Sequence, residues 1–145
     1  MQKINVICVG KIKEEYLRSA IAEYLKRISR FAKVEIKELP EGKSLKDEAE
    51  PILKAAKGFI IALCVEGEKL SSEAFAHRIK TLCDRGEEIS LVIGSSCGLD
   101  KTVKASADLK LSFSDMTFPH QLMRVILLEQ VYRAFMINSG SEYHK

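Results

Sequence analysis

One segment of the chain, residues 59–65, is apolar at every position. It is far too short to cross a bilayer as a helix. A strand that is apolar on both faces has to be buried on both faces, which is typical of parallel strands covered by helices. The segment therefore predicts an α/β fold with a mainly parallel sheet and helices on both faces.

The rest of the chain alternates between strand-like and helix-like patterns. Further strands are expected at 3–9, 34–39, Ile89–Ile93 and 109–113. Helices are expected at 14–31, from Ser44 to 57 with Pro51 as a kink or as the true first turn, from Ser71 or Ser72 to Gly86, from Asp100 to 107, and at 120–137. Ligands of parallel sheets lie beyond the carboxyl ends of the strands, so the loops after 65, 93 and 113 should form the site.

Length and composition narrow the class of protein. A chain of 145 residues forms one domain, here 1–145. Its residues are 46% hydrophobic and 30% charged, a composition that excludes disordered and fibrous proteins. The first residues lack the apolar stretch of a secretion signal, so we expect a cytoplasmic protein with no membrane partner. The net charge of +3 is only a hint of a polyanionic partner.

The cysteines give no sign of a metal centre. Cys8, Cys64, Cys83 and Cys97 form no CxxC pair and no cluster with histidines. Most of them lie in or beside apolar runs, where a thiol usually behaves as a small hydrophobic group. We expect neither a metal site nor a disulfide framework.

The expected last helix, 120–137, begins after Pro119 and is apolar around most of its circumference. Its apolar residues are Leu122, Met123, Val125, Ile126, Leu127, Leu128, Val131, Tyr132, Phe135, Met136 and Ile137. Such a helix has to be covered on more than one side. The sheet can supply one cover and a second subunit the other, which favours a homodimer over a helix buried within one chain.

The loop after residue 93 contains Gly94-x-Ser96-x-Gly98, the spacing of a nucleophile elbow. A serine hydrolase using Ser96 would find its remaining groups in the right chain order, as Asp100 or Asp115 and then His120 or His144. The elbow needs a helix directly after the serine, however, whereas Asp100 resembles a later N-cap. No glycine-rich oxyanion segment precedes the loop.

The same loop can be interpreted without any reactive side chain. Small residues at the end of a strand let a ligand approach the backbone closely, which suits a nucleoside-like cofactor. A non-enzymatic nucleotide-binding α/β module is therefore another alternative. At the start of the last helix, His120, Gln121 and Arg124 fall on one face and could line the same site.

A family resemblance extends over nearly the whole chain. Its most specific block is Phe-Ser-Asp-Met-Thr-Phe-Pro-His-Gln-Leu-Met-Arg at 113–124, followed by Glu-Gln-Val-Tyr-Arg-Ala-Phe at 129–135 and the terminal Tyr-His-Lys. Val9-Gly10-Lys11 near the start and Glu66-Gly67 agree with it. In these segments the chain resembles the RlmH family of the SPOUT superfamily, although Ser95 stands where that family usually has a second glycine.

The resemblance implies a specific reaction. RlmH proteins use S-adenosylmethionine to methylate N3 of pseudouridine 1915 in helix 69 of 23S ribosomal RNA on the assembled ribosome. The SPOUT fold is an α/β sheet whose C-terminal part forms a trefoil knot, and its members act as homodimers. No metal takes part.

The resemblance also implies the residues of the site. Cofactor contacts are expected at Leu63, Gly94, Phe113, Ser114, Asp115, Met116, Thr117 and Phe118. Because the imide N3 is a poor nucleophile until it loses its proton, the chain should supply a base and a group that stabilises the anion. We assign these roles to His144 and Arg124, respectively.

Overall fold

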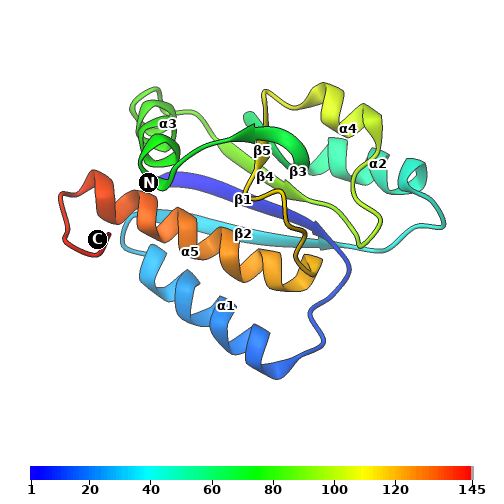
Figure 1. The fold of residues 1–145 in the computed structure, drawn as a ribbon, viewed down its shortest axis with the longest axis horizontal. Coiled ribbons are helices and arrows are strands. Elements are labelled where there is room, and N and C mark those ends of the chain that lie inside the picture. The colour runs from blue at the N-terminus through cyan, green and yellow to red at the C-terminus, as the bar shows by residue number, and fades with distance from the viewer. Residues whose placement is uncertain (145) are drawn as a thin grey trace.

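A computed structural model describes residues 1–144 and contains one sheet of five parallel strands (Figure 1). The strand order is β2-β1-β4-β3-β5. The strands are β1 (Gln2–Val9), β2 (Ala32–Leu39), β3 (Phe59–Lys69), β4 (Ile89–Ile93) and β5 (Leu109–Ser112). All neighbouring strands pair in parallel, so the predicted parallel sheet is confirmed.

Helices cover both faces of the sheet, as predicted. One face carries α1 (Glu15–Ile28), α3 (Ser72–Asp84) and α5 (His120–Asn138), and the other carries α2 (Leu45–Ala55) and α4 (Lys101–Ser106). Alternate strand residues feed the two cores: Val6 and Leu91 belong to the first, whereas Ile7 and Val92 belong to the second.

The expected helix starts are confirmed by their caps. The side chains of Ser44, Ser71 and Asp100 accept hydrogen bonds from the backbone N–H groups of Asp47, Ala74 and Thr102. Pro51 does not open its helix but lies inside α2, so the interpretation as a first turn is wrong. The Ser44 cap begins this helix earlier, and the missing proline N–H leaves one carbonyl of α2 without its helical donor.

Strand β3 is longer than expected and changes register against β5. It continues beyond residue 65 to Lys69, and Leu111 of β5 pairs first with Leu63 and again with Glu68. Gly67 makes this crossing possible, because a Cβ there would lie 2.7 Å from the Lys110 carbonyl carbon. The intervening residues bulge out of the sheet and form one wall of the site described below.

Helix α5 lies on the sheet between α1 and α3 (Figure 1). Its buried residues are Arg124, Leu127, Leu128, Val131, Ala134 and Phe135. Both flanks of the helix are thus covered within one chain, and a second subunit as the cover of its outer side stays a prediction. An outer stripe with Leu122, Val125 and Ile126 stays partly exposed.

Other expectations can be compared with the structure of residues 1–144. All four cysteines are free, and no three metal-ligating side chains lie close enough to hold an ion in this part of the chain. None of its helices is both long and apolar enough to cross a membrane. The trefoil knot stays a prediction, as does the cytoplasmic location.

Candidate functional site

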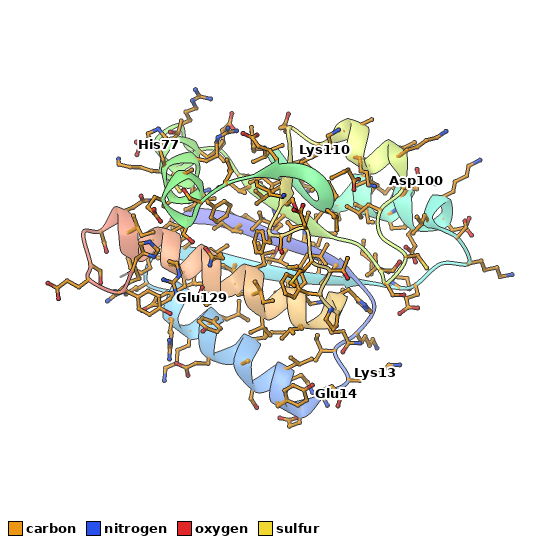
Figure 2. The ribbon with its side chains drawn as sticks, viewed as in Figure 1. Lys13, Glu14, His77, Asp100, Lys110 and Glu129 are labelled. Atoms are coloured by element: carbon orange, nitrogen blue, oxygen red, sulfur yellow. The ribbon has the colours of Figure 1, made fainter. Side chains whose placement is uncertain are left out.

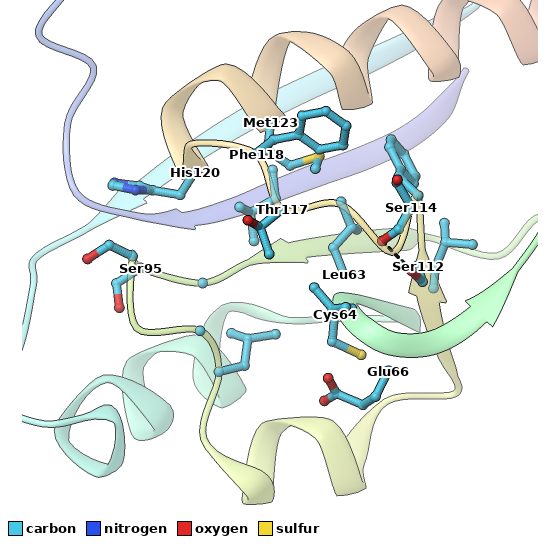
Figure 3. Close-up of a pocket in the computed structure, with 18 of the residues that line it drawn as sticks. Leu63, Cys64, Glu66, Ser95, Ser112, Ser114, Thr117, Phe118, His120 and Met123 are labelled. Carbon is cyan, nitrogen blue, oxygen red and sulfur yellow. Dashed lines mark hydrogen bonds between the residues drawn. The ribbon is translucent and has the colours of Figure 1, made fainter.

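A cavity of about 810 Å³ lies at the carboxyl ends of β3, β4 and β5 (Figure 3). Its walls are the bulge of β3 and the loops 94–98 and 113–119, the three segments that the parallel topology pointed to. Of the expected cofactor residues, the cavity is lined by Leu63, Gly94, Phe113, Ser114, Met116, Thr117 and Phe118.

Asp115 is the exception among the expected cofactor residues. It does not line the cavity, and its side chain is 81% exposed. Its carboxylate lies 2.5 Å from the Lys69 Nζ atom at the end of β3. The ion pair ties the 113–119 loop to the β3 bulge, so Asp115 supports the shape of the cavity from outside.

Hydrogen bonds within the 113–119 loop fix its path. The Ser112 hydroxyl donates to the Ser114 carbonyl oxygen at 3.1 Å, and the Met116 N–H donates to the Ser114 hydroxyl at 2.9 Å. This short-range turn directs Met116, Thr117 and Phe118 along the cavity before α5 begins. The loop therefore presents both backbone and apolar side chains to a ligand.

Gly94 lines the cavity. The sequence suggested that a small residue here lets a ligand approach the backbone, but the structure gives another reason for the missing side chain. A Cβ at this position would lie 2.2 Å from the carbonyl oxygen of Gly98. The loop turns back on itself here, with the Gly98 N–H donating to the Ser95 carbonyl oxygen at 2.9 Å. Gly94 is thus required first by the loop and only then by any ligand.

Ser96 lacks the surroundings of a nucleophile. It is exposed, and the next helix begins only at Lys101, after the Asp100 cap. No residue other than glycine has a positive φ within 1–144, so the strained turn of an elbow is absent from this part of the chain. No hydrogen bond joins Ser96 to a histidine among these residues. The serine hydrolase interpretation is therefore wrong.

Charged groups stand at one side of the cavity. Glu66 from the β3 bulge pairs with Lys104 of α4, and Cys64 lies beside Glu66 (Figure 3). The hydrogen bond from Lys104 lowers the pKa of the Glu66 carboxyl, whereas burial raises the pKa of the Cys64 thiol. At neutral pH the cavity thus presents a carboxylate, an ammonium and a neutral thiol.

The pair of Glu66 and Lys104 was not predicted from the sequence. Glu66 directly follows an apolar strand at its carboxyl end, which is a usable signal. Lys104 carries no such signal, because it reaches the cavity from α4 through a non-local contact.

Arg124, a candidate catalytic residue, is fully buried outside the cavity. Its Nη1 atom lies 2.8 Å from a Glu38 carboxylate oxygen, and Nη2 donates to the carbonyl oxygens of Val9 and Gly10 at 3.1 and 2.7 Å. These contacts hold the end of β1 and the turn after it. A guanidinium in this position does not reach a substrate in the cavity.

The polar cluster expected at the start of α5 is therefore separated. His120 lines the cavity, the Gln121 side chain accepts a hydrogen bond from the Lys13 backbone at 3.4 Å, and Arg124 points into the core. Arg124 is in phase with Leu127, Leu128 and Val131, which all face the sheet. That spacing is the sequence signal that could have revealed its burial.

The C-terminal tail is docked rather than frayed. The Tyr143 hydroxyl donates to Glu129 at 2.9 Å, and His144 lies between Arg133 and Glu73. Figure 2 shows Glu129 on α5, in the middle of the helix. Arg133, which contacts His144, lies 13 residues after His120, or about 20 Å along α5, so the tail lies away from the cavity at the start of this helix.

Comparisons with known proteins agree with this architecture. A family model described as "Predicted SPOUT methyltransferase" matches residues 2–144. A protein of Streptococcus equi subsp. zooepidemicus, named ribosomal RNA large subunit methyltransferase H, is 48% identical, with 99% of each chain covered. A protein of the same name from Bifidobacterium adolescentis is 50% identical at the same coverage.

Solved structures share the fold at low sequence identity. A probable methylase family protein from Haemophilus influenzae gives a TM-score of 0.60 at 10% identity, over 99% of this chain and 71% of that one. A putative methylase family protein from Neisseria gonorrhoeae gives 0.54 at 8% identity, over 90% and 82%. The chain has the α/β SPOUT fold and belongs to the RlmH family of SPOUT methyltransferases.

Proposed function

We propose that this protein transfers a methyl group from S-adenosylmethionine to N3 of pseudouridine 1915 in helix 69 of 23S ribosomal RNA. We further propose that it acts on the assembled ribosome in the cytoplasm. Family membership and the names of the relatives support the reaction class. The observation that carries the proposal is the cavity itself, because seven of the eight expected cofactor residues line it.

The cavity suits an adenosine-containing cofactor. Apolar walls from Leu63, Phe113 and Phe118 can enclose a flat base, and the backbone of two loops can bind its polar edge. The Glu66 carboxylate, held by Lys104, stands where it can accept hydrogen bonds from ribose hydroxyls or balance the positive sulfonium. When bound, S-adenosylmethionine supplies a methyl group that is already activated for transfer.

The chain then has to position and stabilise the target base. Holding N3 in line with the methyl group can lower the barrier by about 7–11 kcal/mol at best. Loss of the N3 proton leaves a negative charge that hydrogen-bond donors stabilise strongly in a water-excluded site. Arg124 does not serve this purpose; we propose that it supports the turn after β1.

We also propose that the protein is a homodimer built on α5. Exposed apolar side chains cluster at the N-terminal end of this helix, with Met116, Phe118 and Leu122 exposed at 75%, 38% and 36%. A two-fold axis across the outer stripe would pack two α5 helices antiparallel. The end of α5 in one subunit, with Tyr143 and His144, would then approach the cavity of the other.

Light scattering tests the dimer. The wild-type protein should have twice the 16.3 kDa chain mass at micromolar concentration. Leu122→Glu should shift it toward the monomer, because it places a charge in the apolar interface. Leu53 of α2 is exposed to a similar extent, 37%, on the opposite face of the sheet, so Leu53→Glu should leave the mass unchanged. A monomeric wild-type protein, or equal dissociation of both variants, would contradict this interface.

Methyl transfer tests the reaction. Labelled S-adenosylmethionine should mark ribosomes that lack the modification, and mass mapping should place the methyl group on N3 of the single pseudouridine. An isolated helix 69 hairpin should be a poor substrate, because a chain of charge +3 makes few phosphate contacts and these carry no sequence information. Cofactor binding without transfer to any RNA would instead support the non-enzymatic nucleotide-binding module.

A further inference from the structure

We propose that Arg133 holds His144 as the Nε2–H tautomer, so that His144 donates a hydrogen bond to the target base instead of removing its proton. This inference rests on the proposed function and on the dimer that brings the tail to a cavity. It replaces the assignment of His144 as the general base.

The tautomer follows from the two contacts of the imidazole ring. The Arg133 Nη1 atom lies 3.0 Å from His144 Nδ1. A guanidinium has donors only, so Nδ1 must accept this hydrogen bond and carries no proton. The neutral ring then bears its proton on Nε2, which lies 2.7 Å from a Glu73 carboxylate oxygen and donates to it.

Arg133 is itself held firmly in place. Its Nη2 and Nε atoms bind the two carboxylate oxygens of Glu129 at 2.8 and 3.2 Å, and its guanidinium lies 5.0 Å from the centre of the Tyr143 ring. The Tyr143 hydroxyl binds the same carboxylate. The hydrogen bonds with Glu129 raise the pKa of Arg133, so the guanidinium stays charged. This arrangement leaves the imidazole little freedom to rotate or to exchange its proton.

A ring fixed in this way has no free lone pair. Nδ1 is occupied by Arg133 and Nε2 already carries a proton, so His144 cannot accept one while the contact lasts. In the dimer, a carbonyl oxygen of the target base would replace the 65% exposed Glu73 carboxylate as the acceptor of this hydrogen bond. His144 therefore acts as a donor toward that oxygen.

The proton and electron balance is then simple. Hydroxide from the solvent removes the N3 proton and becomes water, and the negative charge spreads to the neighbouring carbonyl oxygens. The Nε2–H group of His144 donates to one of these oxygens. The N3 lone pair forms the new N–C bond as the S–C bond breaks, and sulfur keeps the electron pair as a neutral sulfide.

The rate of methyl transfer to ribosomes, measured over a pH series, distinguishes a hydrogen-bond donor at His144 from a general base. His144→Ala should slow the single-turnover rate about 10- to 100-fold, the cost of losing a hydrogen bond to a charged group. His144→Gln should retain most of the rate, because a glutamine amide can donate from nearly the same position. The rate should depend on pH in the same way in the wild type and in His144→Gln, because hydroxide from the solvent removes the proton in both. A glutamine variant as slow as the alanine variant, with a pH dependence that differs from that of the wild type, would overturn the inference.

Nitrogen-15 NMR of the imidazole rings tests the role of Arg133 without activity. The chain has three histidines, and the His144 signals are those lost in His144→Gln. Nδ1 should be unprotonated in the wild type and in Arg133→Lys, which keeps a donor-only group. Arg133→Gln, whose amide can also accept, should populate the Nδ1–H tautomer and slow methylation. Arg27 forms a similar pair with Glu23 on α1, so Arg27→Gln should change neither signal nor rate.

The outcomes also separate this inference from the proposed function. Active wild-type protein with a fully active His144→Ala variant would overturn the role of His144 alone. A protonated Nδ1 in the wild type would overturn the role of Arg133. A wild type that binds S-adenosylmethionine but methylates no RNA would overturn the proposed function, and the donor role with it.

Discussion

Replacing Arg124 with methionine is expected to lower the free energy of unfolding by about 2–5 kcal/mol, mainly because two buried carbonyl oxygens lose their hydrogen-bond donor. The methionine fills part of the space but donates no hydrogen bond. The buried carbonyl oxygens of Val9 and Gly10 then lose their donor, at about 1–3 kcal/mol for each unsatisfied group. Glu38 loses its partner but keeps contact with water, so its share is smaller.

Urea unfolding at a fixed protein concentration measures this effect, because the stability of the proposed dimer would depend on concentration. Arg18→Met is the matched control: its side chain is 56% exposed on α1, and the change should stay within about 0.5 kcal/mol. The folded fraction of Arg124→Met should still bind S-adenosylhomocysteine, since Arg124 does not line the cavity. A stability loss below about 1 kcal/mol, with cofactor binding abolished, would return Arg124 to the site.

Local patterns predicted the elements of the fold well. The expected range Ile89–Ile93 matches β4, and the caps at Ser44, Ser71 and Asp100 begin their helices where expected. These signals are local, because a cap or an apolar run depends on neighbours in the chain. The position of the site also followed, since all parallel strands present their carboxyl ends at one edge.

The β3 bulge could not be predicted in this way. Glu66, Gly67 and Glu68 resemble a polar turn that ends a strand. They continue β3 because Glu68 pairs with Leu111 of β5, far away in the sequence. Strand formation depends on such partners more than on intrinsic preference, so the cavity wall built by this segment was not visible from local patterns.

The burial of Arg124 and the docking of the C-terminal tail could not be predicted, for two different reasons. Arginine is almost never fully buried unless it is paired, and the partners of Arg124 lie far away in the sequence, so its core-facing spacing in α5 alone did not predict its burial. Tyr143 and His144 carry no local signal of docking, because their partners, Glu129 and Glu73, lie on two different helices. Non-local hydrogen bonds to such partners leave no periodic signal in the sequence.

Gly94→Ala is expected to weaken binding of S-adenosylhomocysteine about 100-fold, because the wall of the cavity has to move. The new methyl group would lie 2.2 Å from the Gly98 carbonyl oxygen and 2.6 Å from its carbon, both backbone atoms. The backbone cannot yield as a flexible side chain would, so the 94–98 loop has to open. Both Gly94 and Gly98 line the cavity, which couples this local collision to the ligand.

Calorimetric titration of Gly94→Ala should be compared with Gly86→Ala. Gly86 follows α3 with a φ of +70°, and a Cβ there would lie in open space. Gly86→Ala is therefore destabilised only by the strain of that backbone conformation, about 1–2 kcal/mol. It should be slightly less stable but bind the ligand as the wild type does. If Gly94→Ala also binds normally, the loop tolerates the displacement and takes no part in holding the cofactor. The core of the sheet lies below this loop and should stay intact in Gly94→Ala. The variant should therefore lose more affinity for the ligand than its loss of stability explains.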